Sequence, residues 1–234
     1  AAAGQATLSL SVGGPARSPL VDGHVALRGG ELRVRDPRIL ATDLTLDAQL
    51  ARDRFIIDRL AGTLNGGTLT GAGSGRLAGA RLAEIDVRIE GRGAAVEFPE
   101  GLQSEVDAEL RLVQTHLAEG PLLSGTVTVL RGIYREQVSL ARQLFQPRRR
   151  ARPAAVEPAG RLGALRLNVA IATAEDLVVD NNVGRFEAGA ALRLLGTLAR
   201  PSLAGRIGLR EGGELFLGGT TYRLDRGAID FLNP

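Results

Sequence analysis

The two histidines, His24 and His116, are the residues best suited to metal or acid–base chemistry in this 234-residue chain. A zinc site needs three or four ligands at set spacings, and neither histidine belongs to a His-x-x-x-His pair. Cysteine is absent, which excludes zinc ribbons, iron–sulfur clusters, thiol nucleophiles and disulfides. We therefore expect both histidines to be solvent-facing residues of strands or turns, and we expect no metal and no other cofactor.

Motifs for nucleophilic catalysis and phosphate binding are equally weak. The sequence contains no Gly-x-Ser-x-Gly motif. The run from Gly71 to Gly75 has the spacing G-x-G-x-G and no helical pattern after it, so we interpret it as a β-turn. The acidic run from Glu175 to Asn182 is interrupted by an apolar Leu-Val-Val interval, which predicts a strand that ends in an Asp/Asn turn instead of a calcium loop. The sequence predicts no catalytic residue, and the protein is not expected to be an enzyme.

Charge is nearly balanced along the chain. All 29 basic residues are arginines and 26 residues are acidic, which gives a net charge of +3. One short stretch without acidic residues holds Arg142, Arg148, Arg149, Arg150 and Arg152. Nucleic-acid binding needs a spread basic face, so no nucleic-acid partner is expected. The cluster could contact an anionic membrane surface, but a solvated loop is the favoured interpretation.

The elements that would carry any site have a period of two. Apolar and polar residues alternate over 44–50, 85–89, 106–112 and 165–171, which predicts strands with one apolar and one solvated face. Glycine-rich turn or bulge signals separate such runs at 66–67, 73–75, 91–93, 212–213 and 218–219. Many short strands with glycine turns predict an all-β protein built as a meander.

A repeated unit reinforces this prediction. The frame Pro-x-[Leu/Val]-x-Gly-x-[Val/Ile]-x-[Leu/Val]-x-x-Gly occurs three times without gaps, with its first two fixed positions at Pro19 and Gly23, Pro121 and Gly125, and Pro201 and Gly205. Apolar residues upstream keep the same offsets to the proline: Leu8 and Leu10, Leu110 and Leu112, Ala190 and Leu192. We expect the proline to end one strand, the middle glycine to permit a close backbone approach, and the last glycine to form a turn. Such units bury apolar surface by stacking side by side into an elongated sheet.

One segment departs from the strand pattern. Tyr134, Val138, Ala141 and Phe145 follow the spacing of one face of a short helix, and prolines and arginines follow it. We therefore divide the chain into a β-rich groove segment over 1–133, an amphipathic helix and flexible basic linker over 134–160, and a second β segment over 161–234. No apolar run is long enough for a membrane helix, and the absence of Met at position 1 suggests a longer precursor.

The last segment resembles a known family. Gly196-Thr197 is followed by Pro201-x-Leu-x-Gly205-x-Ile207, and the chain closes on Gly227-x-Ile229-x-Phe231-x-x-Pro234. Residues 160–234 are similar in these motifs to the C-terminal region of the TamB family, the AsmA-like inner-membrane component of the translocation and assembly module of diderm bacteria. The resemblance implies a U-shaped, solenoid-like sheet with an apolar groove, sometimes called a β-taco.

The resemblance also implies a function. Family members bridge the periplasm, move phospholipid to the outer membrane and support the assembly and secretion of outer-membrane proteins. The implied location is the periplasm, with an inner-membrane anchor and most contacts to an outer-membrane barrel-assembly protein outside this chain. The residues expected to line the groove for phospholipid acyl chains are Leu165, Leu167, Val169, Ile171, Leu192, Leu194, Leu203, Ile207 and Leu209.

Two alternatives stay open at this point. From the residues alone, the same apolar positions could fill a dry sandwich core. A different class of function is a β-strand scaffold, which would hold outer-membrane β-barrel proteins by edge augmentation without conducting lipid. A conduit needs a continuous apolar interior, whereas a scaffold needs a free edge strand.

Overall fold

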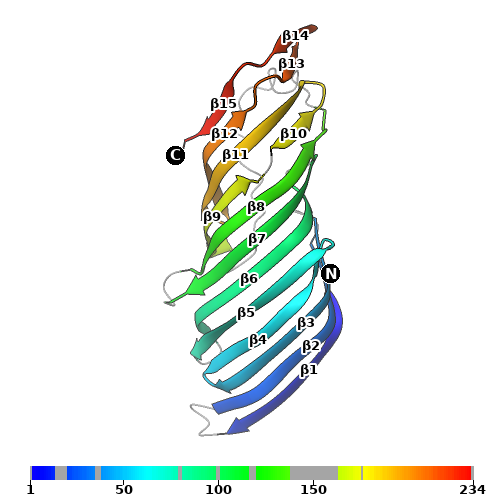
Figure 1. Ribbon diagram of the computed structural model, residues 1–234. Helices are drawn as coiled ribbons and strands as arrows, with labels where there is room; N and C mark the ends of the chain where they lie inside the picture. Colours follow the sequence, from blue (N-terminus) through cyan, green and yellow to red (C-terminus); the bar gives the residue numbers. More distant parts are fainter. Residues whose placement is uncertain are drawn as a thin grey trace.

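The structure is a computed structural model that describes residues 2–13, 20–34, 38–78, 81–98, 101–115, 120–137, 163–174 and 176–232. Its strands form one sheet (Figure 1). The first eight strands are β1 (Ala2–Gly13), β2 (Leu20–Val34), β3 (Ile39–Arg52), β4 (Arg54–Leu64), β5 (Gly67–Ala78), β6 (Arg81–Glu97), β7 (Leu102–Gln114) and β8 (Leu122–Tyr134). The remaining strands are β9 (Arg166–Thr173), β10 (Leu177–Asp180), β11 (Gly184–Thr197), β12 (Arg200–Leu209), β13 (Glu214–Leu217), β14 (Thr220–Arg223) and β15 (Gly227–Phe231).

The sheet is a meander with one change of direction. Strands β1 to β8 pair in chain order, all antiparallel. Strands β9 and β10 then both run parallel to β8 and antiparallel to β11, and β11 leads on to β12 and β15. The parts of the chain before and after the predicted insertion therefore belong to one sheet. The prediction of an elongated all-β sheet is confirmed, although β1 to β8 are 11 to 17 residues long and not short.

The predicted helix and basic linker fall mostly on residues 138–162, which lie outside the described residues. Tyr134, the first position of the predicted helical face, is the last residue of β8. The predicted strand over 177–180 and its Asp/Asn turn are confirmed, because the Asn181 Oδ1 accepts hydrogen bonds from the backbone N–H groups of Val183 and Gly184.

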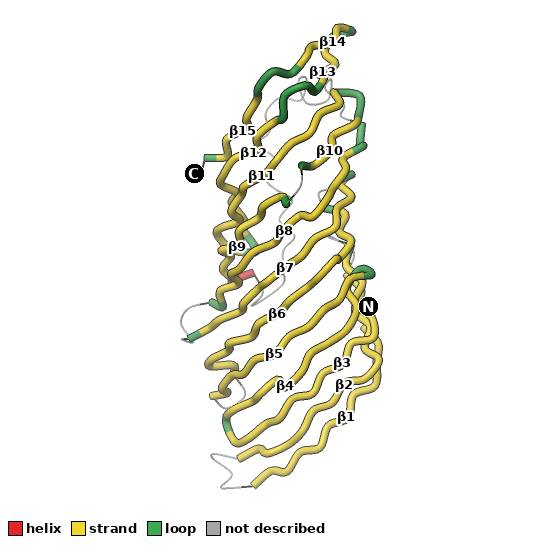
Figure 2. The backbone as a smooth tube through the Cα atoms, viewed as in Figure 1, coloured by secondary structure: helices red, strands yellow, loops and turns green. Residues whose placement is uncertain are grey.

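The sheet bends along one line, which we call the crease. Four strands carry an extra residue there: Gly29 in β2, Asp43 in β3, Gly93 in β6 and Leu130 in β8. Extra residues of this kind bend a strand and increase its twist. Further along the same line, β9 ends at Thr173 and β10 begins at Leu177. Beyond the crease the short ends of the strands turn behind the front layer, so that the sheet is U-shaped (Figure 2).

Asn65 holds the short arm of the U together. The β4–β5 hairpin is shorter than its neighbours at this end, and its turn residue Asn65 fills the gap between β3 and β6. The Asn65 side chain accepts a hydrogen bond from the Leu40 N–H at 2.6 Å and donates to the Arg38 and Ala95 carbonyls at 3.1 and 2.7 Å. Its φ of 46° suits asparagine, which tolerates the left-handed region better than most residues.

The middle glycines of the repeat occupy equivalent places. Gly23, Gly125 and Gly205 each lie opposite a leucine of the preceding strand, respectively Leu10, Leu110 and Leu192. A Cβ at any of the three would overlap a backbone carbonyl of that strand, so the predicted close approach is confirmed. The residues that match upstream of the proline occupy equivalent positions in the ladder in the first and third copies only. In the second copy the register is shifted by two residues, because the β7–β8 connection is longer.

Two predictions about glycine were wrong. Gly71, Gly73 and Gly75 do not form a turn but lie inside β5, where the side chains of neighbouring strands lean over them. The last glycine of the repeat forms a turn only at Gly212, because Gly30 and Gly132 lie within strands beside the crease.

Candidate functional site: an apolar trough

One face of the sheet, called here the inner face, is apolar from β1 to β15. Residues directly opposite each other in a ladder share a face, so the register identifies its members. One row runs from Leu8 to Leu167 through Val25, Ala48, Ile57, Gly73, Val87, Leu112 and Leu123. A second row begins on β8 and crosses Gly125, Val169, Leu194 and Leu203. The inner face is the concave side of the U and forms an apolar trough.

Eight of the nine predicted groove residues belong to this face by register. Leu167, Val169 and Ile171 of β9 pair with β8 on one side and β11 on the other. Leu192 and Leu194 of β11 continue into β12, where Leu203, Ile207 and Leu209 follow. Leu165 has no regular structure and lies one residue before β9. That these residues contact lipid stays a prediction.

Burial in the trough is incomplete. Leu167 and Val169 are buried, whereas the other seven predicted residues are half-buried. Nearer the two ends of the sheet Leu8, Leu10 and Ile229 are about half exposed, at 59, 47 and 50%. Among the described residues nine apolar side chains are buried, four of them alanines, and no large side chain is completely enclosed. A dry sandwich core would enclose most of its large side chains, because protein interiors are close-packed.

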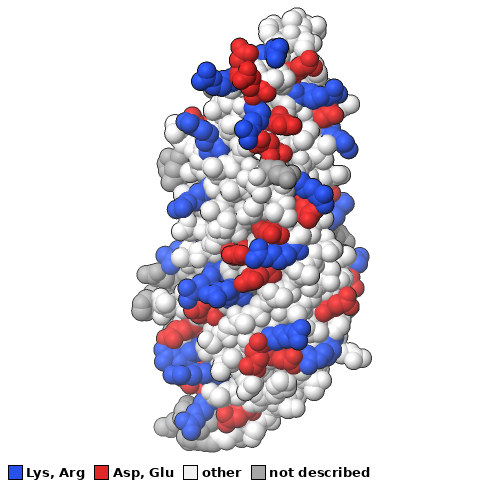
Figure 3. All heavy atoms as spheres, in the orientation of Figure 1, with Lys and Arg blue, Asp and Glu red and all other residues white. Residues whose placement is uncertain are grey.

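The outer face is charged, and its charges are paired across strands. Figure 3 shows acidic and basic side chains beside one another in groups on the face that is turned to the viewer. Arg28 binds Asp47 at 2.8 Å, Arg111 binds Asp86 at 2.5 Å, and Arg206 binds Asp230 at 2.6 Å. Arg92 contacts both Asp107 and Glu109, at 3.3 and 2.5 Å. This face is therefore suited to water, unlike the inner face.

These contacts shift the titration of the paired groups. Hydrogen bonds from the Arg28, Arg111 and Arg206 guanidinium groups lower the pKa of the Asp47, Asp86 and Asp230 carboxyl groups respectively. The same bonds raise the pKa of each arginine. All these groups stay charged at neutral pH, so none is poised for acid–base catalysis.

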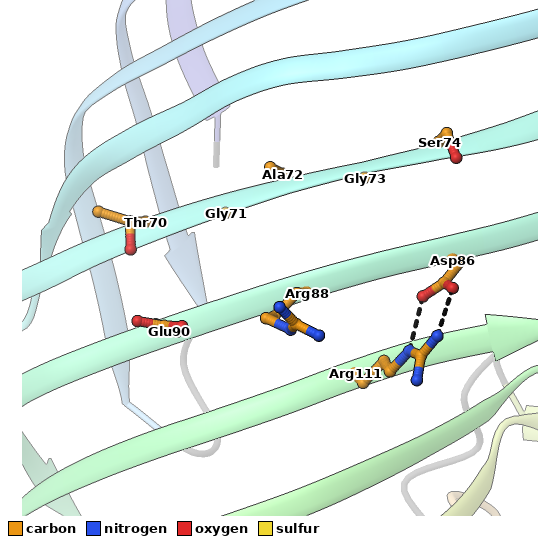
Figure 4. Close-up of a pocket in the computed structure, with 9 residues that line it drawn as sticks. All are labelled: Thr70, Gly71, Ala72, Gly73, Ser74, Asp86, Arg88, Glu90 and Arg111. Carbon is orange, nitrogen blue, oxygen red and sulfur yellow. Dashed lines mark hydrogen bonds and ion pairs between the residues drawn. The ribbon is translucent and has the colours of Figure 1, made fainter.

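A shallow depression of about 520 Å³ lies on the outer face over β5 (Figure 4). Its floor is formed by the small side chains of Thr70, Ala72 and Ser74, which leave space beside the longer side chains of β6. The Arg111 guanidinium bonds both Asp86 carboxylate oxygens at one end, while Arg88 and Glu90 extend beside the floor. The depression is open and polar, and its residues form no nucleophile–base pair.

The described residues contain no metal centre. His24 lies on β2, is 53% exposed as predicted, and has its Nε2 3.8 Å from an Asp47 carboxylate oxygen. His116 lies outside the described residues. Within the part of the chain that is described, no three histidine, aspartate or glutamate side chains converge on one point. No helix found in that same part is long and apolar enough to cross a membrane.

The fold and the trough define the class of protein: an open β-trough, apolar inside and ion-paired outside. The family model of the TamB C-terminal domain matches residues 58–234, and the chain belongs to that family. The TamB family is a transport and assembly component of the bacterial envelope. No curated protein and no solved structure matches the chain.

Sequence reasoning missed part of the inner face. The predicted groove residues all lie in the C-terminal third, but the apolar rows extend through Leu46, Leu60, Leu110 and Val127. The sequence contained a signal for these residues, since apolar and polar residues alternate over 44–50 and 106–112 as clearly as over 165–171. The crease was also missed, although an Arg-Gly pair at 28–29, 92–93 and 131–132 marks it.

Proposed function

We propose that this chain is part of a bridge across the periplasm, in which phospholipid moves between the inner and outer membranes along the apolar trough. The observation that carries the proposal is the continuous apolar inner face from β1 to β15, most of whose large side chains are only half-buried. Surface of this kind is unfavourable in water unless something apolar covers it.

Acyl chains have the chemistry to cover this surface. The rows consist mostly of Leu, Val, Ile, Ala and Gly, and their aromatic members include Phe55, Phe186 and Phe231. Each methylene group transferred from water to such a surface contributes about 0.8 kcal/mol. The charged groups of the described strands lie on the other face, so the lipid headgroup would stay in water at the open side. No covalent step is needed.

The proposed function also implies a location and a partner for the protein. The protein would lie in the periplasm of a diderm bacterium, joined to the inner membrane by a segment outside this chain. It would also support the assembly of outer-membrane proteins with a barrel-assembly partner. Membership of the TamB family supports this role in general.

A second candidate is a scaffold that binds β-barrel proteins by edge augmentation. It is favoured by β14, whose four residues are all exposed and which pairs only with β13 among the described strands. A free edge presents unpaired N–H and C=O groups that another strand could bind. This function needs no lipid in the trough.

Native mass spectrometry of the purified chain, incubated with detergent-dispersed phosphatidylethanolamine, tests the first proposal. We expect bound phospholipid in the native protein and its loss on placing a charge inside the trough, as in Val127→Asp. The matched control is Thr126→Asp, whose side chain lies on the outer face of the same strand and is exposed. Equal lipid binding by both folded variants would contradict conduction along the trough and leave the scaffold.

A further inference from the structure

We propose that the crease is a hinge, and that a row of arginine–carboxylate pairs on the outer face sets its angle and so the width of the trough. Only the role of the hinge in lipid movement rests on the proposed function, because the hinge itself is a property of the sheet. It is argued from the backbone at the crease, from the small residues inside it and from the ion pairs outside it.

The backbone ladder is interrupted along the crease. The extra residues in β2, β3, β6 and β8 and the gap between β9 and β10 remove regular pairs along one line, whereas the β4–β5 and β5–β6 ladders cross this line in regular register. Side chains replace some of the lost partners. The Gly93 N–H donates to the Asp107 carboxylate at 2.8 Å, and the Ala190 N–H donates to the Thr173 hydroxyl at 3.1 Å. At the strands with extra residues, bending along this line breaks fewer backbone hydrogen bonds than bending where the ladder is regular.

On the concave side of the crease, glycines lie opposite leucines of the neighbouring strands. Gly30, Gly62 and Gly91 lie there in β2, β4 and β6, on the inner face. Gly93 itself has a φ of 63°, a conformation that glycine adopts without strain. The Leu44 side chain lies over Gly30 and Gly62, so the glycines make room at the bend for the leucines of neighbouring strands.

The convex side carries ion pairs beside the extra residues of β2, β6 and β8 and beside the gap between β9 and β10. Arg28 binds Asp47, Arg92 binds Asp107 and Glu109, Arg131 Nε binds Glu105 at 2.8 Å, and Arg210 binds Asp176 beside the gap between β9 and β10. The arginines are exposed, with 52 to 76% of each side chain accessible, whereas the side chains of Asp47, Glu105, Asp107 and Asp176 are only 18 to 30% accessible. The pairs of Arg28, Arg92 and Arg131 tie neighbouring strands together beside the extra residues, and Arg210 with Asp176 joins the ends of β12 and β10.

A row of such pairs can hold the hinge reversibly, because each pair is weak enough to break on its own. An exposed ion pair contributes about 0–1 kcal/mol and is screened by salt. Several ion pairs beside the missing backbone hydrogen bonds favour one hinge angle but still allow others. Neutralising them should relax the hinge and leave the two arms intact.

Spin-label distance measurements test this, and the chain has no cysteine to interfere. Gln103→Cys and Thr126→Cys place labels on the outer surface on either side of the crease, and Ser74→Cys with Thr126→Cys is a reference pair within the long arm. The test variant is Glu105→Gln with Asp107→Asn, whose amides keep the shape and can still accept the Gly93 hydrogen bond. The control is Asp86→Asn, which removes an ion pair between the same two strands away from the crease.

We expect the 103–126 distance distribution to broaden and shift in the test variant, and to stay native in the control and in the reference pair. The native protein at high salt should resemble the test variant at low salt. If the test variant does not fold, the salt titration of the native protein still tests whether ion pairs set the hinge angle. A 103–126 distribution that is unchanged by salt or by neutralisation would overturn the hinge.

Lipid binding, measured on the same samples, separates this proposal from the proposed function. A responsive distance in a protein that binds no phospholipid supports the hinge and contradicts conduction. An unresponsive distance in a protein that binds phospholipid supports conduction and overturns the hinge.

Discussion

The Asn65 side chain accepts a hydrogen bond from the Leu40 backbone N–H at 2.6 Å and donates one to the Ala95 carbonyl at 2.7 Å, so one turn residue joins β3 to β6. The Asn65 backbone joins the same two strands, because its N–H donates to the Leu40 carbonyl at 2.8 Å and its carbonyl accepts from the Ala95 N–H at 3.2 Å. We infer that Asn65 fixes the short arm of the U.

Asn65→Ala is expected to lower the free energy of unfolding by about 1–3 kcal/mol, because it removes three hydrogen bonds and places alanine at a φ of 46°. Asn65→Gly keeps the conformation accessible and should cost less. Urea denaturation followed by circular dichroism measures both. Equal stability of Asn65→Ala and the native protein would show that the short arm does not depend on this residue.

The repeat glycines make a second prediction. Gly125→Ala would push a Cβ into the Glu109 carbonyl at a φ of 137°, and should destabilise the protein by about 2–4 kcal/mol. Gly208→Ala is the matched control in β12, since a Cβ there meets nothing within 4 Å. It should be neutral or raise stability by up to about 1 kcal/mol. Thermal melting distinguishes the two, and similar melting temperatures would refute the close approach.

Acid should weaken the sheet through its outer face. The Asp47, Asp86 and Asp230 carboxyl groups have a lowered pKa in the folded state because arginines bond them. Groups of this kind stabilise the fold above their unfolded pKa of about 4, and the contribution is lost as pH falls through their folded values. Unfolding free energy should therefore drop below about pH 4. Asp86→Asn should make that slope shallower, and an identical slope would contradict a role for its pairing with Arg111.

Much of the fold could be predicted because strand alternation is local. The runs at 44–50, 85–89, 106–112 and 165–171 lie in β3, β6, β7 and at β9, and the three repeat glycines occupy equivalent places. Period two also put Val169, Leu194 and Leu203 on one face, since register follows from which face is apolar.

The rest depends on neighbours that a single strand does not reveal. Gly71, Gly73 and Gly75 resemble a turn in the sequence, but they lie in a strand because Phe55, Leu60 and Val87 occupy the space over them. The Arg-Gly pairs at 28–29, 92–93 and 131–132 mark single irregularities, but the crease depends on the register that brings them onto one line. The parallel pairing of β8 with β9 likewise depends on how the chain returns after Tyr134.

The central claim is that acyl chains lie on the inner face, and site-specific photocrosslinking tests it most directly. A photoreactive amino acid is placed in turn at Val127, Ile207 and Leu194 on the inner face, and at Thr126, Arg206 and Arg193 beside them on the outer face. The protein is then irradiated in bacteria, and adducts are identified by mass spectrometry. We expect phospholipid adducts at the three inner positions and none at the outer ones. Adducts in equal yield on both faces, or protein adducts alone, would contradict the trough as a lipid path.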